Sequence, residues 1–273
     1  MSANQRPRPA LSELSVTEFL TLSRVGYLPH GVVIGSSIYE AGNQFDWVVA
    51  TGEVVSLSNA LRSARALALS RMIDQASALN AEGVVDVRLV IEHDIWRGGR
   101  QVAKFVALGT AIGFDAEIAP AHMRTAPSLR LARGIPFTSD LTAVDFVLLL
   151  RAGYRPITLA MGACVYGLDP RAMRAYRDKD EEVQEYTQAF FDARETAMER
   201  LQEDLFQVHP KGSQDSPAGI VGMTVSETIY GGGQTAPIVE FAAVGTAITP
   251  LIERDPRRSN EHPKPQLVVP LDR

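Results

Sequence analysis

The sequence has almost no cysteine, since Cys164 is the only one in 273 residues. A single thiol excludes a disulfide within the chain and suits a reducing compartment. A long apolar run is lacking too, because the most apolar stretch, residues 143–150, is far too short to cross a bilayer. Residues 1–9 are polar and contain proline, unlike the apolar core of a signal peptide. We therefore expect a soluble, cytoplasmic protein without a membrane span.

Basic residues are not in excess, because 27 Lys and Arg face 32 Asp and Glu and the formal net charge is −5. Nucleic-acid binders usually present a basic face, so this balance argues against a nucleic-acid partner. Apolar residues make up 45% and charged residues 22% of the chain, which is ordinary globular usage. The length allows two domains of about 100–150 residues each.

The usual spacing of metal ligands is also absent. None of the histidines lies two to four residues from another histidine or from the cysteine; they are His30, His93, His122, His209 and His262. Glu92, His93 and Asp94 form the densest group, yet on a strand the two acids face one way and the histidine the other. Glu92, His93 and Cys164 are therefore weak candidates for metal ligands, and the sequence predicts neither catalytic residues nor a defined cofactor site.

What the sequence does contain is an internal repeat. Residues 18–27 resemble residues 145–154 at an offset of 127, and residues 105–112 resemble residues 241–248 at an offset of 136. Each of the two later blocks ends in Gly-Thr-Ala-Ile. We interpret the chain as a tandem duplication of one small α+β domain. The recurring residues, which we assign to the structure or the assembly of the repeat, are Gly26, Tyr27, Gly35, Gly109, Thr110, Gly153, Tyr154, Gly162, Gly245 and Thr246.

Each copy is predicted to contain one strand, one helix and two further strands. In the first copy, the patterns predict strands over residues 31–39, 84–92 and 102–112 and a helix over residues 58–79. Ser56 or Ser58 is expected to cap this helix, and Asn80 and Gly83 to end it. In the second copy the helix is expected over residues 181–206. Glycines at 98–99 and 231–233 predict hairpin turns between the last two strands.

The last strand of the first copy is apolar on both faces. Phe105 and Ala107 lie on one face, and Val106 and Leu108 on the other. A single helix covers only one face of a small sheet, and a bare apolar face favours association. We therefore expect the chain to form a homo-oligomer. Cys164 takes the place of Ser37 in the repeat, which is the position of a small buried residue, and the first copy has no thiol there.

The glycine-spaced first strand, the alanine-rich helix, residues 79–85 and the terminal residues 107–112 together resemble the YbjQ family. Its members carry the label of heavy-metal-binding domains. The resemblance covers residues 26–112 and, more loosely, residues 153–248. It implies a dodecin-like β-α-β-β domain with a small antiparallel sheet, which assembles into a pentameric ring through additional strand pairing. The chain departs from the single-domain family in its duplication, in an insertion over residues 43–53 and in an acidic run over residues 178–185.

The sequence thus divides into a first copy at residues 14–113, a linker at 114–136, a second copy at 137–250 and a proline-rich tail at 251–273. In the linker, Leu129 and Leu131 could still pack. The predicted function is that of a non-enzymatic homo-oligomer, a ring of five chains with a repeated surface for a metal, a small ligand or a protein. A metal is implied by the family resemblance alone. The alternative is an enzyme whose active site forms between subunits.

Overall fold

The computed structural model describes residues 11–40, 51–96, 100–169, 171, 181–209, 213, 215–230 and 238–251. For residues 40, 91–96, 100–103, 207–208 and 230 the description is limited to the backbone. Four expectations lie outside the described residues: most of the insertion with Trp47, both glycine turns, residues 178–180 of the acidic run and the tail from residue 252. Within the described part of the chain, no helix is both long and apolar enough to cross a membrane.

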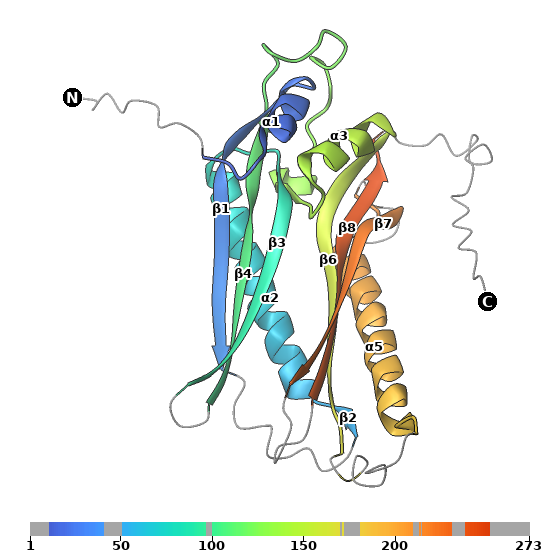
Figure 1. Ribbon diagram of the computed structural model, residues 1–273. Coiled ribbons are helices and arrows are strands. Elements are labelled where there is room, and N and C mark those ends of the chain that lie inside the picture. Colours follow the sequence, from blue (N-terminus) through green and yellow to red (C-terminus); the bar gives the residue numbers. More distant parts are fainter. Residues whose placement is uncertain are drawn as a thin grey trace, which may run out of the picture.

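The first half of the chain forms one sheet with one long helix (Figure 1). Its strands are β1 (Tyr27–Glu40), β3 (Gly83–Trp96) and β4 (Arg100–Phe114), and its helix is α2 (Val55–Ala78). The short helix α1 (Val16–Ser23) precedes β1. The strand order is β1-β4-β3-β5, where β5 (Phe137–Thr138) comes from further along the chain and pairs in parallel with β3. The other pairings are antiparallel.

The second half has its elements in the same order beside the first (Figure 1). After the 3₁₀ turn η2 (Ala132–Gly134) and β5 come α3 (Ala143–Arg151), β6 (Tyr154–Gly167), α5 (Gln184–Val208), β7 (Gly219–Tyr230) and β8 (Ile238–Pro250). The strand order is β2-β6-β8-β7, and β2 (Gly52–Glu53) comes from the first half. Each sheet thus receives one short strand from the other half. We call β1, α2, β3 and β4 the first unit, and β6, α5, β7 and β8 the second unit.

The expected elements are present with small shifts at their ends, and α1, α3, β2 and β5 are additional. The cap prediction for α2 was wrong, because the helix begins at Val55, before either serine. Ser58 instead accepts a hydrogen bond from the backbone N–H of Val165 in the second unit, at 3.0 Å. Asn80 ends the helix as expected, with a φ of 54° that Asn tolerates better than most residues.

One glycine in each unit lets the long helix lie directly on its sheet. A Cβ atom at Gly35 would come within 1.8 Å of the carbonyl oxygen of Ala68, and one at Gly162 within 1.8 Å of that of Ala197. No side chain fits at either position, so the recurrence of these glycines has a steric cause. The two contacts also align the helices, because they pair Ala68 of α2 with Ala197 of α5.

The edge strands β3 and β7 are irregular at positions that correspond. The register shifts between Val85 and Arg88 in β3, and between Val221 and Thr224 in β7. The residue inside each irregularity has a positive φ, 53° at Asp86 and 66° at Gly222. A β-bulge places an extra residue in one strand and bends it, so both edge strands bend at the same place.

Helix α2 packs between the two sheets. One core cluster joins the helix side chains to both units; it contains Val33, Ala64, Ala68, Met72, Ala76, Phe105 and Ala107 of the first unit with Leu159, Met161, Ala163 and Ala242 of the second. A separate cluster holds α5 against the opposite face of the second sheet, through Ala160, Ala197, Leu201, Phe241 and others. The second sheet is therefore covered on both faces, whereas Ile34 and Ile38 on the first sheet are exposed.

Candidate functional site

The two units contact each other through side chains and through the short segments that contain β2 and β5, and we call this whole contact the seam. Part of it is strand pairing on the edge of β3. Ser139 donates its N–H to the carbonyl of Val84 and accepts the N–H of Val87, both at 2.9 Å. The N–H of Asp86, inside the bulge, donates to the carbonyl of Leu141 at 2.9 Å. Residues 137–141, just before α3, thereby satisfy backbone groups that an edge strand leaves open.

A recurring threonine holds this segment in place. Thr246 is fully buried, lies 2.9 Å from the hydroxyl of Ser139 and accepts the N–H of Asp140 at 3.0 Å. Its hydroxyl donates to the carboxylate of Asp140. Burial raises the pKa of Asp140 above its ordinary value, although the bond from Thr246 and backbone bonding oppose the shift. Thr246, which we assigned to the structure or the assembly of the repeat, thus binds the segment before α3.

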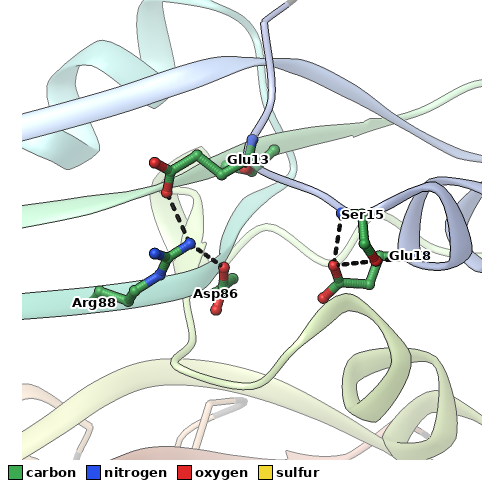
Figure 2. Close-up of polar contacts among 6 residues, drawn as sticks. Glu13, Ser15, Glu18, Asp86 and Arg88 are labelled. Atoms are coloured by element: carbon green, nitrogen blue, oxygen red, sulfur yellow. Dashed lines mark hydrogen bonds and ion pairs between the residues drawn. The ribbon is translucent and has the colours of Figure 1, made fainter.

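The corresponding threonine of the first unit contacts the corresponding segment. Thr110 is buried and accepts the N–H of Glu13 at 3.4 Å. Figure 2 shows how this segment is fixed further: Arg88 lies between Glu13 and Asp86, with both oxygens at 3.0 Å from Nη2. The hydrogen bond and charge of Asp86, followed by the charge of Glu13, raise the pKa of Arg88.

Each segment ends in a helix cap, which was not among the sequence predictions. Ser15 and Glu18 form a capping box at the start of α1, with Ser15 N–H and Oγ donating to Glu18 at 2.8 and 2.7 Å (Figure 2). Thr142 caps α3 by accepting the N–H of Asp145 at 3.1 Å. A Ser or Thr followed three residues later by an acid is a sequence signal for a helix start. This signal would have located α1 and α3.

The second part of the seam is an apolar contact on α2. Val165 and Ile238 of the second sheet pack against Leu57 and Leu61 of the helix. Arg65, one turn further on, reaches Asp204 on α5 at 3.2 Å. Burial lowers the pKa of Arg65 to about 10, against the opposing effect of Asp204. The guanidinium therefore remains charged at neutral pH and is paired inside the contact.

Short strand β2 completes the seam. The N–H of Val54 donates to the carbonyl of Val165 at 2.8 Å, and Glu53 pairs with Arg200 of α5 at 2.6 Å. Arg200 also donates to the carbonyl of Ala163 at 3.1 Å, as Arg71 of α2 does to that of Ser36 in the first unit. Neither of the two sequence offsets relates Arg71 to Arg200, because the two long helices correspond at a third offset.

Cys164 lies in the core cluster of the second unit and is fully buried. Burial, and then the charge of Glu53, raise the pKa of its thiol to about 11. The thiolate is the reactive and metal-binding form of cysteine. The thiol therefore stays protonated at neutral pH, as expected for a small core residue.

The other metal candidates are not brought together. Glu92 and His93 lie on β3 opposite Lys104 and Ala103 of β4, and their side chains are outside the description. His30 is exposed, with Nδ1 3.0 Å from the carbonyl of Leu79. Among the described residues, no three His, Cys, Asp or Glu side chains are grouped closely enough to hold a metal ion.

Among the described histidines, His209 is buried and lies beside an ion pair. Arg155 pairs with Asp215 at 2.5 Å, and Asp215 also accepts the N–H of Ala132 at 2.9 Å. Burial lowers the pKa of His209, although the nearby Asp215 opposes the shift. No partner for its Nε2 atom occurs within the described ranges. The cluster ties η2 to the start of β6, which is a structural role.

A cavity of about 350 Å³ lies between α1, α3 and the linker. Its walls include Arg24 and Arg151, which correspond at the offset of 127, and the recurring Tyr27, with His122 and Leu129. Tyr27 is buried and contacts Phe146 edge to face at 5.4 Å between ring centroids. Leu129 is buried as well, so this part of the linker packs as expected. A mostly apolar cavity with two arginines in its wall suits a small anion with an apolar body.

The remaining recurring residues lie in turns, beside the bulges or at the start of a strand. Gly26 and Gly153 adopt φ angles of 87° and 81° in the turns after α1 and α3, which favour glycine. Gly109 and Gly245 each face a bulged edge strand, where a Cβ atom would lie 2.7 Å from Val84 and from Ile220. Tyr154 is half-buried at the start of β6.

Comparisons with known proteins give two matches. Residues 28–115 match the YbjQ family model, which is described as "Putative heavy-metal-binding". Over 266 residues the chain is 34% identical to the encapsulin nanocompartment protein Rv1762c of Mycobacterium tuberculosis (strain ATCC 25618 / H37Rv), a match that covers 96% of this chain and 91% of that protein. The family model covers one copy, so the second copy stays a prediction.

Proposed function

Because this chain belongs to the same family as the encapsulin nanocompartment protein of Mycobacterium tuberculosis, we propose that it is a structural subunit that assembles with copies of itself into a ring and performs no catalysis. The relative is named for a nanocompartment, and the match spans nearly the whole of both chains. A ring subunit needs two surfaces that are complementary to each other and no catalytic residues of its own. The exposed surfaces of this chain support that function.

The observation that carries the proposal is the difference between two faces that hold the same place in their sheets. On the first sheet, Ile34 is 47% and Ile38 is 59% exposed. On the second sheet, the residues at the same positions, Met161 and Val165, are 4% and 1% exposed because α2 covers them. Apolar residues that are buried in one unit and exposed in the other indicate a surface that assembly covers.

We also infer that the two units are copies of one domain, with boundaries at residues 14–113 and 137–250. Support comes from the corresponding bulges, the two glycines under the helices and the two threonines that hold the segments before α1 and α3. On this interpretation the linker includes the wall of the cavity beside Tyr27.

The size of the assembly can be measured directly. We propose five chains, following the ring size implied by the YbjQ resemblance. Size-exclusion chromatography with light scattering, at micromolar concentration, is expected to give five times 29.7 kDa. A mass of 29.7 kDa at that concentration would refute assembly itself, whereas a different multiple would refute only the number five.

A second candidate is the binding of a small anion with an apolar body. The observation that favours it is that Arg24, Arg151 and Tyr27, which recur in the sequence, line a single cavity. Titration with an anilinonaphthalene sulfonate dye, followed by fluorescence, tests this. We expect the Arg24→Ala, Arg151→Ala double variant to weaken binding at least tenfold, or about 1.4 kcal/mol. Equal binding by wild type and variant would contradict the candidate. The enzyme alternative stays a prediction, because it requires residues from two subunits.

A further inference from the structure

The seam inside one chain shows what the exposed surfaces of that chain can bind. In its apolar part, Val165 of the second sheet packs on Leu57 and Leu61 of α2. The position of Val165 is held by Ile38 in the first unit, and Ile38 is 59% exposed. One half of a second contact of this kind is therefore present on the outside of the first unit.

The other half is present on α5. With Ala68 aligned to Ala197, Tyr186 and Phe190 of α5 stand where Leu57 and Leu61 stand on α2. Both aromatic residues line an open hollow of about 370 Å³, together with Phe191, Arg194 and Glu227. An apolar side chain that entered this hollow would repeat the contact that Val165 makes on α2.

The strand pairing of the seam also has two counterparts on the surface of the chain: a segment before α1 and the edge of β7. Residues 137–141 pair on the edge of β3, and the segment at the same place before α1 comprises residues 11–14. Leu11 in this segment is 73% exposed. The edge of β7, which holds the place of β3 in the second unit, is exposed along residues 222–229. Within the part of the chain that the structure describes, one segment without a strand partner and one open edge are thus available on opposite units.

The exposed segment is already fixed for strand pairing. Glu13 is held by Arg88 through its side chain and by Thr110 through its N–H, and Ser15 is held by the capping box with Glu18 (Figure 2). Asp140 is held by Thr246 in the same way while its segment pairs with β3. A segment that is ordered before it binds loses less conformational entropy on binding.

We propose that each chain binds the next one head to tail through a second seam, in which Ile38 of a second copy enters the hollow on α5 and residues 11–14 of that same copy pair in parallel with β7. The inference rests on the proposed function and names its contact. The second seam uses the same kinds of element as the internal seam. One unit contributes a helix and an edge strand, and the next unit contributes a sheet face and the segment that precedes it. First and second units then alternate around one continuous ring, so that five chains place ten units in that ring and not in two stacked rings of five like units.

The contact is heterologous, since the two surfaces differ, and such a contact closes into a ring or continues as a filament according to its angle. The hollow on α5 also carries a positive charge. Arg194 of α5 holds the place of Arg65 on α2 and is exposed at the hollow, where it lies 5.2 Å over the ring of Phe191. A positive charge at position 38 of the second copy is therefore repelled, and a negative charge in place of Arg194 attracts it.

The first experiment changes these charges and measures the mass of the full-length protein by light scattering. We expect Ile38→Lys to reduce the assembly to the 29.7 kDa chain without loss of helical circular dichroism, because Ile38 is exposed in the folded chain. Adding Arg194→Glu to Ile38→Lys should restore the wild-type mass. Leu148→Lys on α3, an equally exposed apolar position outside the second seam, should leave the mass unchanged.

The second experiment fixes the strand register. Within the chain Val84 pairs with Thr138, and the same positions in the second seam are Ile220 and Leu11. We expect Leu11→Cys with Ile220→Cys, in a Cys164→Ser background, to form disulfides between chains on mild oxidation. A non-reducing gel should then show a ladder at multiples of 29.7 kDa. Leu11→Cys with Thr228→Cys, at the far end of β7, should give no ladder.

The outcomes separate the two proposals. If the wild type is a 29.7 kDa monomer, both the proposed function and the second seam are wrong. If the wild type is an oligomer whose mass Ile38→Lys leaves unchanged, or the Leu11 and Ile220 cysteines do not cross-link, the second seam alone is wrong. An Ile38→Lys monomer that Arg194→Glu rescues supports the second seam.

Discussion

Strands β3 and β7 hold the same place in their sheets, bend at the same bulge and differ in what covers them. On β3, Val87 is 4% exposed beneath residues 137–141 and the second sheet. On β7, Met223 at the same position is 48% exposed. The sequences of the two strands are similarly apolar, so the difference comes from the neighbour and not from the strand. An open edge of this kind is a template for pairing with another chain.

The largest effect is expected from a charge placed on the two corresponding sheet faces. Met161→Glu buries an unpaired carboxylate between α2 and the second sheet, and should cost roughly 4–5 kcal/mol or more of the free energy of unfolding. Ile34→Glu, at the same position of the first sheet, should leave the chain folded and lower the mass of the assembly. Urea unfolding followed by circular dichroism, with light scattering, measures both. A folded Met161→Glu variant of wild-type stability would break the comparison.

The fold could be predicted from the sequence where the signal is local and long. Helix α2 begins three residues before its predicted start, and Asn80 ends it as expected. Strands β2 and β5 could not be predicted, because each has two residues and its pairing partner lies in the other half of the chain. Short strands have no periodicity to detect, and their hydrogen bonds exist only once the units are packed.

The seam was likewise only partly predictable. Thr110 and Thr246 emerged from the repeat, but their partners at Glu13 and Asp140 follow from the fold. The ion pair of Arg65 with Asp204 joins two helices far apart in the sequence, and no spacing rule connects them. The recurrence of a polar residue therefore located part of the contact without showing what it contacts.

The ion pairs of the two units also differ in how deeply they are buried. Arg155 and Asp215 are both buried, whereas Arg88 is more than half exposed beside Glu13. Arg155→Ala leaves the carboxylate of Asp215 buried without its charge partner and should cost about 3–5 kcal/mol. Arg88→Ala should cost less than about 1 kcal/mol. Equal losses in urea unfolding at pH 7 would contradict the difference in burial.

The same pair gives a pH dependence. Burial of Asp215 acts to raise its pKa, but the N–H of Ala132 and the guanidinium of Arg155 outweigh it, so the pKa lies below the ordinary value. A carboxylate with a depressed pKa in the folded state stabilises above the unfolded pKa of about 3.9, and this contribution disappears as the pH falls through the folded pKa. The cost of Arg155→Ala should therefore shrink below about pH 4.

A smaller effect of opposite sign is expected at Asp140, whose pKa burial raises. The protonated form is then favoured in the folded state, so the charged carboxylate lowers stability at neutral pH and the penalty vanishes below the unfolded pKa. Asp140→Asn keeps the oxygen that accepts from Thr246. It should raise the free energy of unfolding at pH 7, by less than about 1 kcal/mol, and leave it unchanged at pH 3. Glu13→Gln, at the same place before α1, should instead lower stability slightly by losing Arg88.

The smallest effect is expected where the two units differ by one atom. Ser37 of the first unit is buried and donates its hydroxyl to the carbonyl of Ala64 in α2. Cys164 holds the same position in the second unit, and the alignment of the helices places the carbonyl of Ala193 opposite it. Cys164→Ser should therefore find an acceptor and change the free energy of unfolding by less than about 1 kcal/mol. A loss of several kcal/mol, measured by urea unfolding, would mean that the thiol has a role the serine cannot fill, and that the two units are not equivalent at their cores.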